Sequence, residues 1–273
     1  MIISLLGAES TGKSTLAAAL HRHLLAAAAT LPAELALPTI THVPEYLRSW
    51  CLQHGRNPRQ DEQAHIAHTQ AERLTSAAHP VGGAPCWVIA DTTPWMTAVY
   101  SDHYFGDSTL YAQAQPLHHV PLAAPHTPEP ISLGTALPPL NLLMGLDLPW
   151  AADGALRDGP TTQQAIDNRL RQQLDRWQCP YQTIYGSGTA RVAAALQAIS
   201  YHLTPHLHVD CRINAWQIAI KSEAEYSINE SVGSQKNVKY ASACDCCDDT
   251  ASERQTFSRL LAGRRAPPAS VGP

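Results

Sequence analysis

The sequence predicts an α/β fold in which a doubly wound parallel sheet is covered by helices on both faces. Short apolar segments with the length of buried strands alternate along the chain with segments of helical character. Strands that are apolar throughout and alternate with helices are typical of a parallel sheet. In such sheets, ligands bind at the carboxyl ends of the strands. The strands are expected at residues 2–6, 39–43, 86–90, 141–146 and 181–185, and the main helices at residues 13–28, 61–78, 163–177 and 190–203.

A glycine-rich loop follows the first predicted strand. Residues 7–14 read Gly-Ala-Glu-Ser-Thr-Gly-Lys-Ser, which is the pattern of a phosphate-binding loop set between a strand and a helix. The backbone N–H groups of such a loop surround the β- and γ-phosphates of a nucleotide, and Gly7 and Gly12 let the backbone approach them. Lys13 is expected to bridge these phosphates, and the Ser14 hydroxyl is expected to hold Mg²⁺. The sequence therefore predicts a nucleotide-binding protein that uses ATP and Mg²⁺.

Arg191 is the one predicted nucleotide contact that lies far from this loop in the sequence. It ends the turn at residues 186–191, which follows the fifth predicted strand. In this type of fold that turn commonly borders the adenine; a plain strand-to-helix turn is the alternative. The Asn-Lys-x-Asp motif that selects guanine does not occur in the sequence, which favours ATP. The predicted ATP-binding residues are Gly7, Glu9, Ser10, Thr11, Gly12, Lys13, Ser14, Thr15 and Arg191.

The composition favours a small molecule as the partner of this site. The 273 residues include 19 Lys and Arg against 23 Asp and Glu, for a net charge of −4, so no basic field attracts nucleic acid or acidic lipid. No apolar stretch reaches the roughly 18 residues that a membrane span needs. The loop at residue 7 leaves no room for a secretory signal, so a cytoplasmic protein with reduced or metal-bound cysteines is expected. The oligomeric state stays open.

Polar residues follow the second and third predicted strands. Glu45 is the candidate catalytic base, because a kinase needs a carboxylate that accepts the proton of the attacking hydroxyl. The alternatives are a substrate ligand and a glutamate stabilised at a helix N-terminus. Arg48 is expected to contact a phosphate or to pair with Glu45. Asp91 is expected to hold Mg²⁺ through water or to bind a substrate ribose, and a helix cap is its alternative. Trp95 either stacks on a substrate ring or packs in the core.

A segment flanked by glycines precedes the fourth main helix. Residues 150–160 carry Arg157 between acidic residues, which suits a lid that closes over ATP. Arg157 would then stabilise charge on the transferring phosphoryl group, whereas the alternative is a solvated loop. Together with Lys13, Glu45 and Asp91, Arg157 completes the predicted catalytic set. These features define the expected fold more narrowly, as that of a P-loop kinase.

Two segments depart from the alternation of strands and helices. Residues 116–139 hold seven prolines and three histidines, which predicts an irregular insertion in a kinase domain that spans residues 1–204. Residues 205–273 are expected to form a poorly ordered C-terminal appendage, whose deletion would leave activity and melting temperature nearly unchanged. The appendage contains Cys244, Cys246 and Cys247, which either bind zinc or are solvated thiols; their irregular spacing favours thiols.

Four blocks in this order resemble the NadR-type ribosylnicotinamide kinase family. They are residues 7–15, Val-Pro-Glu-Tyr-Leu-Arg at 43–48, Asp-Thr-Thr-Pro at 91–94, and Leu-Pro-Trp-Ala-Ala-Asp-Gly-Ala-Leu-Arg-Asp at 148–158. The resemblance covers about residues 1–203. It implies transfer of the ATP γ-phosphate to the 5′-hydroxyl of nicotinamide riboside. The alternatives are a kinase for another nucleoside or small metabolite and a nucleotide-binding regulatory switch without an acceptor substrate. The resemblance also implies that Glu45 and Asp91 lie at the reacting hydroxyl and ribose, and that Asp153, a predicted substrate-binding residue, belongs with Arg157 to the lid.

Overall fold

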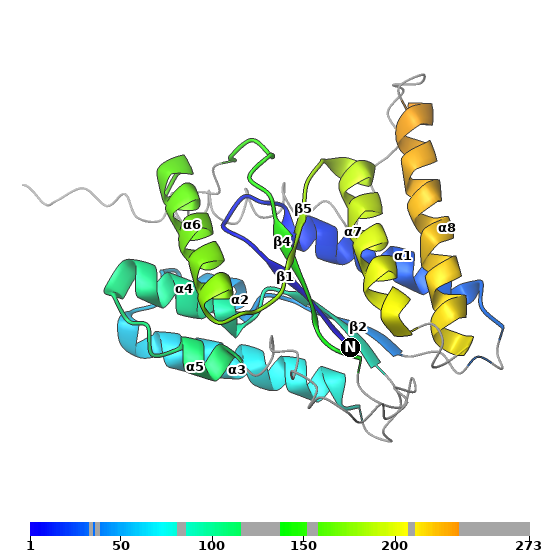
Figure 1. Cartoon of the computed structure of the whole chain (residues 1–273). Helices are drawn as coiled ribbons and strands as arrows, with labels where there is room; N and C mark the ends of the chain where they lie inside the picture. Colours follow the sequence, from blue (N-terminus) through cyan, green and yellow to red (C-terminus); the bar gives the residue numbers. More distant parts are fainter. Residues whose placement is uncertain are drawn as a thin grey trace, which may run out of the picture.

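The computed structural model describes residues 1–32, 35, 39–80, 86–115, 137–151, 158–206 and 211–234. In this part of the chain, five parallel strands form one sheet in the order β2-β3-β1-β4-β5 (Figure 1). The predicted α/β fold with a parallel sheet is therefore confirmed. The strands are β1 (Ile2–Leu6), β2 (Thr39–Val43), β3 (Cys86–Asp91), β4 (Leu140–Met144) and β5 (Gln182–Ile184).

Helices cover both faces of the sheet, as a doubly wound fold requires. Figure 1 shows α1, α7 and α8 on one side and α3, α4, α5 and α6 on the other. The short helix α2 lies against α3, and a 3₁₀ turn at Thr204–His206 follows α7. The bounds are α1 (Lys13–Ala29), α2 (Tyr46–His54), α3 (Gln60–Ala78), α4 (Pro94–Phe105), α5 (Tyr111–Ala114), α6 (Pro160–Arg176), α7 (Gly188–Leu203) and α8 (Cys211–Ser234).

The central strands are buried on both faces, which explains why they are apolar at nearly every position. Ile3 and Leu5 of β1 point towards α1 and α7, whereas Leu6 points towards α4 and α6. Successive side chains of a strand point to opposite faces of a sheet, so an uninterrupted apolar run covers two cores at once. The apolar strand residues therefore form the centre of the fold.

Helix α8 corrects the expectation for the segment after residue 205. Its inner face packs on α1 and α7, where Ile213, Trp216 and Ile220 are buried in the same core cluster as β1. The Trp216 ring lies 4.7 Å from the Trp87 ring of β3, measured between centroids. The expectation of a poorly packed segment is thus wrong for α8. The residues from 235 onwards, Cys244, Cys246 and Cys247 included, lie outside the described part of the chain.

The topology explains where the glycine-rich loop lies. Strand β1 sits between β3 and β4, and the chain leaves it through α1 towards β2, on the β3 side of the sheet. From β4 the chain leaves in the opposite direction, through α6 towards β5. Such a reversal opens a crevice at the carboxyl ends of the two strands. The loop that follows β1 is therefore placed at the switch point of the sheet.

Candidate nucleotide-binding site

The loop between β1 and α1 has a backbone that only glycine adopts easily at two positions. Gly7 has φ 149° and Gly12 has φ 78°, in the left-handed region at the start of α1. Neighbouring atoms also exclude a side chain, because a Cβ atom on Gly7 would lie 3.0 Å from Met144 Cβ, and one on Gly12 would lie 3.0 Å from Leu148 Cδ1. Conformation and space thus both require glycine at these positions.

Side chains from the surrounding elements hold the carbonyl groups of this loop. Gln163 of α6 donates to the Glu9 carbonyl over 2.8 Å, and Arg191 of α7 donates to the Thr11 carbonyl. The Thr11 hydroxyl closes the loop internally by donating to the Ala8 carbonyl over 2.7 Å. In a planar trans peptide the N–H points away from the C=O, so these bonds turn the N–H groups of Ser10 and Gly12 away from the two helices. Backbone N–H groups fixed in this way are the element from which phosphate-binding loops are built.

Arg191 is buried, with 3% of the residue exposed. Its guanidinium group also forms an ion pair with Asp147, and it donates to the Gly145 carbonyl over 3.4 Å. Asp147 in turn accepts a hydrogen bond from the Gly186 N–H group. Arg191 therefore braces the loop against the segments that follow β4 and β5. A direct contact with ATP stays a prediction.

Lys13 lies inside the loop and is 8% exposed. Its ammonium group donates to the Gly7 carbonyl over 2.8 Å and to the Ala8 carbonyl over 2.9 Å. Burial lowers the pKa of Lys13, and the negative charges of Glu45 and Asp91 partly oppose this shift. The Nζ atom of Lys13 is thus held by two loop carbonyls within the electrostatic influence of Glu45 and Asp91, a position suitable for binding the phosphates of a nucleotide.

Glu45 precedes α2 and turns its carboxyl group into the site, where 12% of the side chain is exposed. Arg48, one turn along α2, lies 3.5 Å from Glu45 Oε2 through its Nε atom, so the predicted pair between these residues is present. Burial raises the pKa of Glu45, while the charges of Lys13 and Arg48 partly lower it again. A carboxylate with a raised pKa is a better proton acceptor than a solvated one.

Asp91 ends β3, next to Leu5 of β1, and is 4% exposed. Its Oδ1 atom is buried and has no hydrogen-bond partner in the described part of the chain. A buried carboxylate oxygen of this kind needs a cation or a proton donor. A Mg²⁺ ion with its water ligands provides both, so Asp91 and the partly exposed Ser14 at the start of α1 fit the predicted Mg²⁺ site.

The interpretation of Trp95 as a residue that stacks on a substrate ring is corrected. Trp95 is fully buried in α4, where its ring lies 5.6 Å from that of Tyr111 and 6.4 Å from that of Trp177. It belongs to the core between the sheet and α6. A ring that is enclosed by aromatic neighbours has no face left for a substrate.

Two residues near the site were missed by sequence reasoning. Tyr100 lies on α4, and its phenol has a raised pKa because of burial and the nearby charges of Glu9 and Glu45. Gln70 lies on α3 and is hydrogen-bonded to the peptide groups on both sides of Glu45. A tyrosine and a glutamine on helices carry no motif. Only their position in space connects them with the loop.

Some predicted features fall outside the described residues. These are Asp153 and Arg157 of the predicted lid, together with most of the 116–139 insertion. At the end of the segment predicted to form a lid, Asp158 accepts a hydrogen bond of 2.7 Å from the Tyr104 hydroxyl. Within the described ranges, no group of three His, Cys, Asp or Glu side chains could hold a metal ion. None of the described helices has both the length and the apolar character needed to cross a membrane.

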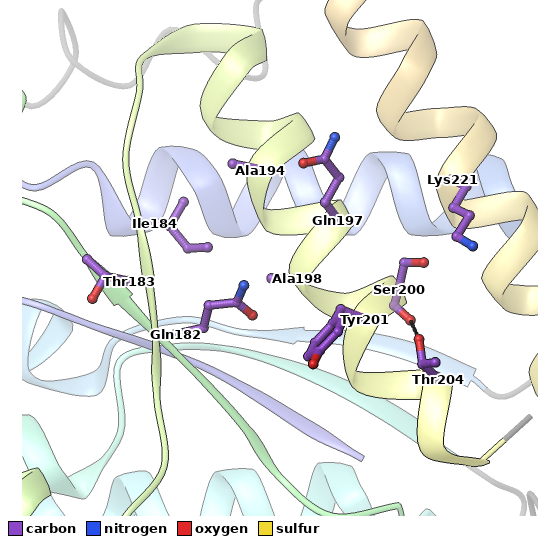
Figure 2. A pocket seen from close by; sticks show the side chains of 10 residues that line it. All are labelled: Gln182, Thr183, Ile184, Ala194, Gln197, Ala198, Ser200, Tyr201, Thr204 and Lys221. Atoms are coloured by element: carbon purple, nitrogen blue, oxygen red, sulfur yellow. Dashed lines mark hydrogen bonds between the residues drawn. The ribbon is translucent and has the colours of Figure 1, made fainter.

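A separate pocket opens between the edge strand β5 and α7. Figure 2 shows Gln182 and Ile184 on its strand side, Gln197 and Tyr201 on α7, and Lys221 reaching over from α8. None of the residues that line it contributes to the loop or to the carboxylates described above. The pocket is therefore not part of the candidate nucleotide site.

The fold and the loop define the class of the protein. A glycine-rich loop that ends in Gly-Lys-Ser and joins the first strand of a doubly wound parallel sheet to a helix is the phosphate-binding element of P-loop nucleotide-binding proteins. The sequence model of the AAA domain family matches residues 2–191, and the chain belongs to this family, which is of the P-loop NTPase type. No curated protein shows significant similarity to the sequence.

Proposed function

We propose that the protein is a kinase that transfers the γ-phosphoryl group of ATP to the 5′-hydroxyl of nicotinamide riboside, with nicotinamide mononucleotide as the product. The observation that carries the kinase proposal is the position of Glu45. Its carboxyl group, on a side chain that is 12% exposed, lies within the electrostatic influence of Lys13, and its pKa is raised, which suits a general base. The resemblance of four sequence blocks to the ribosylnicotinamide kinases supports the choice of acceptor.

The proposed reaction assigns one role to each side chain. Glu45 accepts the proton of the 5′-hydroxyl while the hydroxyl oxygen forms a bond to the γ-phosphorus and the bond from this phosphorus to the leaving ADP oxygen breaks. Lys13 compensates the negative charge of the β- and γ-phosphates. Arg48 holds Glu45 through their ion pair. Ser14 and Asp91 would hold Mg²⁺, which neutralises phosphate charge when bound. Arg157 and Asp153 would act from the lid.

One assay tests the acceptor and the reaction class together. ATP consumption is measured with a panel of nucleosides that includes nicotinamide riboside, and the products are identified by mass. We expect equal amounts of ADP and nicotinamide mononucleotide. Turnover with a different nucleoside or small metabolite only would reject nicotinamide riboside as the acceptor. ATP binding without transfer to any acceptor would reject the kinase proposal and leave a nucleotide-dependent switch.

A further inference from the structure

The side chain of Gln70 connects the two loops that carry the site's carboxylates. Gln70 lies in the middle of α3 and is 1% exposed. Its Oε1 atom accepts a hydrogen bond of 2.8 Å from the Tyr46 N–H group. Its amide nitrogen donates to the carbonyls of Pro44 and Thr92, each over 3.5 Å. Pro44 and Tyr46 flank Glu45, and Thr92 directly follows Asp91, so a single carboxamide contacts both segments.

A carboxamide is the side-chain group that suits this position. It offers one oxygen as an acceptor and two N–H groups as donors. In Gln70 the oxygen takes the single N–H of Tyr46, and the two N–H groups serve two carbonyls. A glutamate would lose both donors, and a methionine of similar length would lose all three bonds. The match between donors and acceptors is therefore specific to this side chain.

Each of the two loops, at residues 44–46 and 91–92, has a backbone feature that needs stabilising contacts from another element. The Tyr46 N–H is in the first turn of α2, where N–H groups have no acceptor within the helix. The Glu45 side chain does not cap this turn. Thr92 has φ 77°, a left-handed conformation that is strained for a β-branched residue and persists only where the surroundings hold it. Gln70 contacts both of these points.

We propose that Gln70 is a positioning residue, which fixes Glu45 relative to Asp91 by holding the peptide groups next to them. This inference rests on the proposed kinase function for its effect on rate. Within the described part of the chain, the hydrogen-bond partners of Gln70 are Pro44, Tyr46 and Thr92, all on the two loops that carry the carboxylates, and none is on the phosphate-binding loop. Loss of Gln70 should therefore reduce turnover and leave ATP binding unchanged.

Gln70→Met tests the inference, and Gln63→Met is its matched control. Gln63 lies two turns earlier on α3 and is also buried, with 3% exposed. Its Oε1 atom has no hydrogen-bond partner in the described part of the chain, and the bonds to the two loops there come from Gln70 instead. We measure kcat, the KM and Kd for ATP, and hydrogen exchange at the Tyr46 amide. Tyr46 exchange reports on the Gln70 bond without any phosphoryl acceptor.

We expect Gln70→Met to lower kcat about 10²-fold, because a small displacement of reacting groups has effects of this size. The Kd for ATP should stay within about twofold, and Tyr46 exchange should become about tenfold faster, as expected for the loss of one hydrogen bond. Gln63→Met should match the wild type in kcat, in the Kd for ATP and in Tyr46 exchange. Wild-type kcat in Gln70→Met, or equal losses in both variants, would overturn the inference.

A second variant covers the case in which Gln70→Met does not fold. Gln70→Glu keeps the acceptor for Tyr46 but places a carboxylate oxygen against the carbonyls of Pro44 and Thr92. For Gln70→Glu we expect Tyr46 exchange as slow as in the wild type, together with a reduced kcat. A wild-type kcat would overturn the inference. If the wild type transfers phosphate to no acceptor, the proposed function fails, and Tyr46 exchange in Gln70→Met still decides whether Gln70 holds the loop.

Discussion

The guanidinium group of Arg191 is hydrogen-bonded to the Thr11 carbonyl, and this bond joins the start of α7 to the phosphate-binding loop. The same group pairs with Asp147, which follows β4. Arg191 belongs to the last strand-to-helix unit, β5 and α7, whereas the loop it fixes belongs to the first unit, β1 and α1. The shape of the loop therefore depends on residues that lie far from its own sequence.

We predict that Arg191→Met weakens ATP binding about 10- to 100-fold, because hydrogen bonds from a charged donor to the loop are lost. Arg171→Met is the control, since Arg171 also pairs with an aspartate, Asp167, over 2.7 Å, but does so along α6. Titration calorimetry gives the Kd for ATP of both variants. Equal affinity of Arg191→Met and the wild type would show that the loop keeps its shape without this brace.

Lys13→Ala should abolish phosphoryl transfer and leave the fold intact. The lysine compensates phosphate charge that is present only with bound nucleotide. Its own burial disfavours the ammonium form, as the lowered pKa shows, so its removal should not reduce stability much. Product formation and the thermal melting curve test both parts. Turnover close to that of the wild type would reject the assignment of the loop.

Glu45→Gln should lower the rate about 10²- to 10⁴-fold, which is the usual effect of losing a general base. The Kd for ATP should change little, because the base acts on the hydroxyl of the acceptor. Single-turnover rates and nucleotide titrations separate the two effects. If ATP affinity collapses while the rate at saturation is maintained, Glu45 is a structural or Mg²⁺-binding residue.

The pH dependence of stability should differ in sign between Glu45→Gln and Glu62→Gln. The raised pKa of Glu45 means that its ionised form is less favourable in the folded state, so wild type loses stability as pH rises through that pKa, and Glu45→Gln does not. Arg56 and the Arg59 N–H lower the pKa of Glu62 to about 2, so its stabilisation is present above pH 4.5.

At pH 8 we therefore expect Glu45→Gln to be more stable than wild type and Glu62→Gln to be less stable. Denaturant unfolding from pH 8 to pH 5 measures the free energy of unfolding of all three proteins. The advantage of Glu45→Gln should shrink as pH falls, whereas the deficit of Glu62→Gln should persist to pH 5. Two variants with the same sign at pH 8 would contradict the electrostatic description of the site.

Trp216→Ala should destabilise the protein by about 3–5 kcal/mol, because it removes a fully buried aromatic side chain that packs on Trp87. Ile218→Ala is the control on the same helix, since Ile218 is 58% exposed, and it should change stability by less than about 0.5 kcal/mol. This prediction replaces the expectation that removal of all residues after 205 is harmless. Similar unfolding midpoints for both variants would show that α8 adds nothing to the core.

Strands and the loop were predictable because their residues leave few alternatives. β1 and β2 were predicted with their observed bounds, β1 because it is apolar at all but one position and β2 because all but one of its residues are β-branched. The 7–14 loop was identified from glycines that its backbone requires. Local sequence determines these features, so one sequence suffices to find them.

Helix α8 was missed because its buried face is chemically mixed. Ile213, Trp216 and Ile220 are buried, but Gln217 is buried too, whereas Ile218 and Tyr226 are exposed. Apolar residues on the outer face and a polar residue on the inner face weaken the 3.6-residue period that predicts an amphipathic helix. Packing against α1 and α7 decides the structure here, and that information is not local.

The carboxylates of the site were predicted correctly as residues at strand ends, but their surroundings were not. The pattern of the β3 strand places Asp91 at the carboxyl edge. The burial of its Oδ1 atom follows from neighbouring elements, and so do the bonds of Gln70. Trp95 was open to two interpretations because a tryptophan after a strand end can face the ligand or the core. Its contacts with Tyr111 and Trp177 could come only from the structure.

The packing of α8 on α1 has a consequence for synthesis on the ribosome. The chain leaves the ribosome from its N-terminus, so β1, the loop and α1 emerge long before Trp216. Until then, the α1 face of the sheet exposes Trp87, which Trp216 covers in the finished protein. The nascent protein therefore carries an uncovered apolar surface from the emergence of Trp87 until the emergence of Trp216, a form that chaperones bind. A ribosome stalled before residue 211 should hold a chain that is still sensitive to protease.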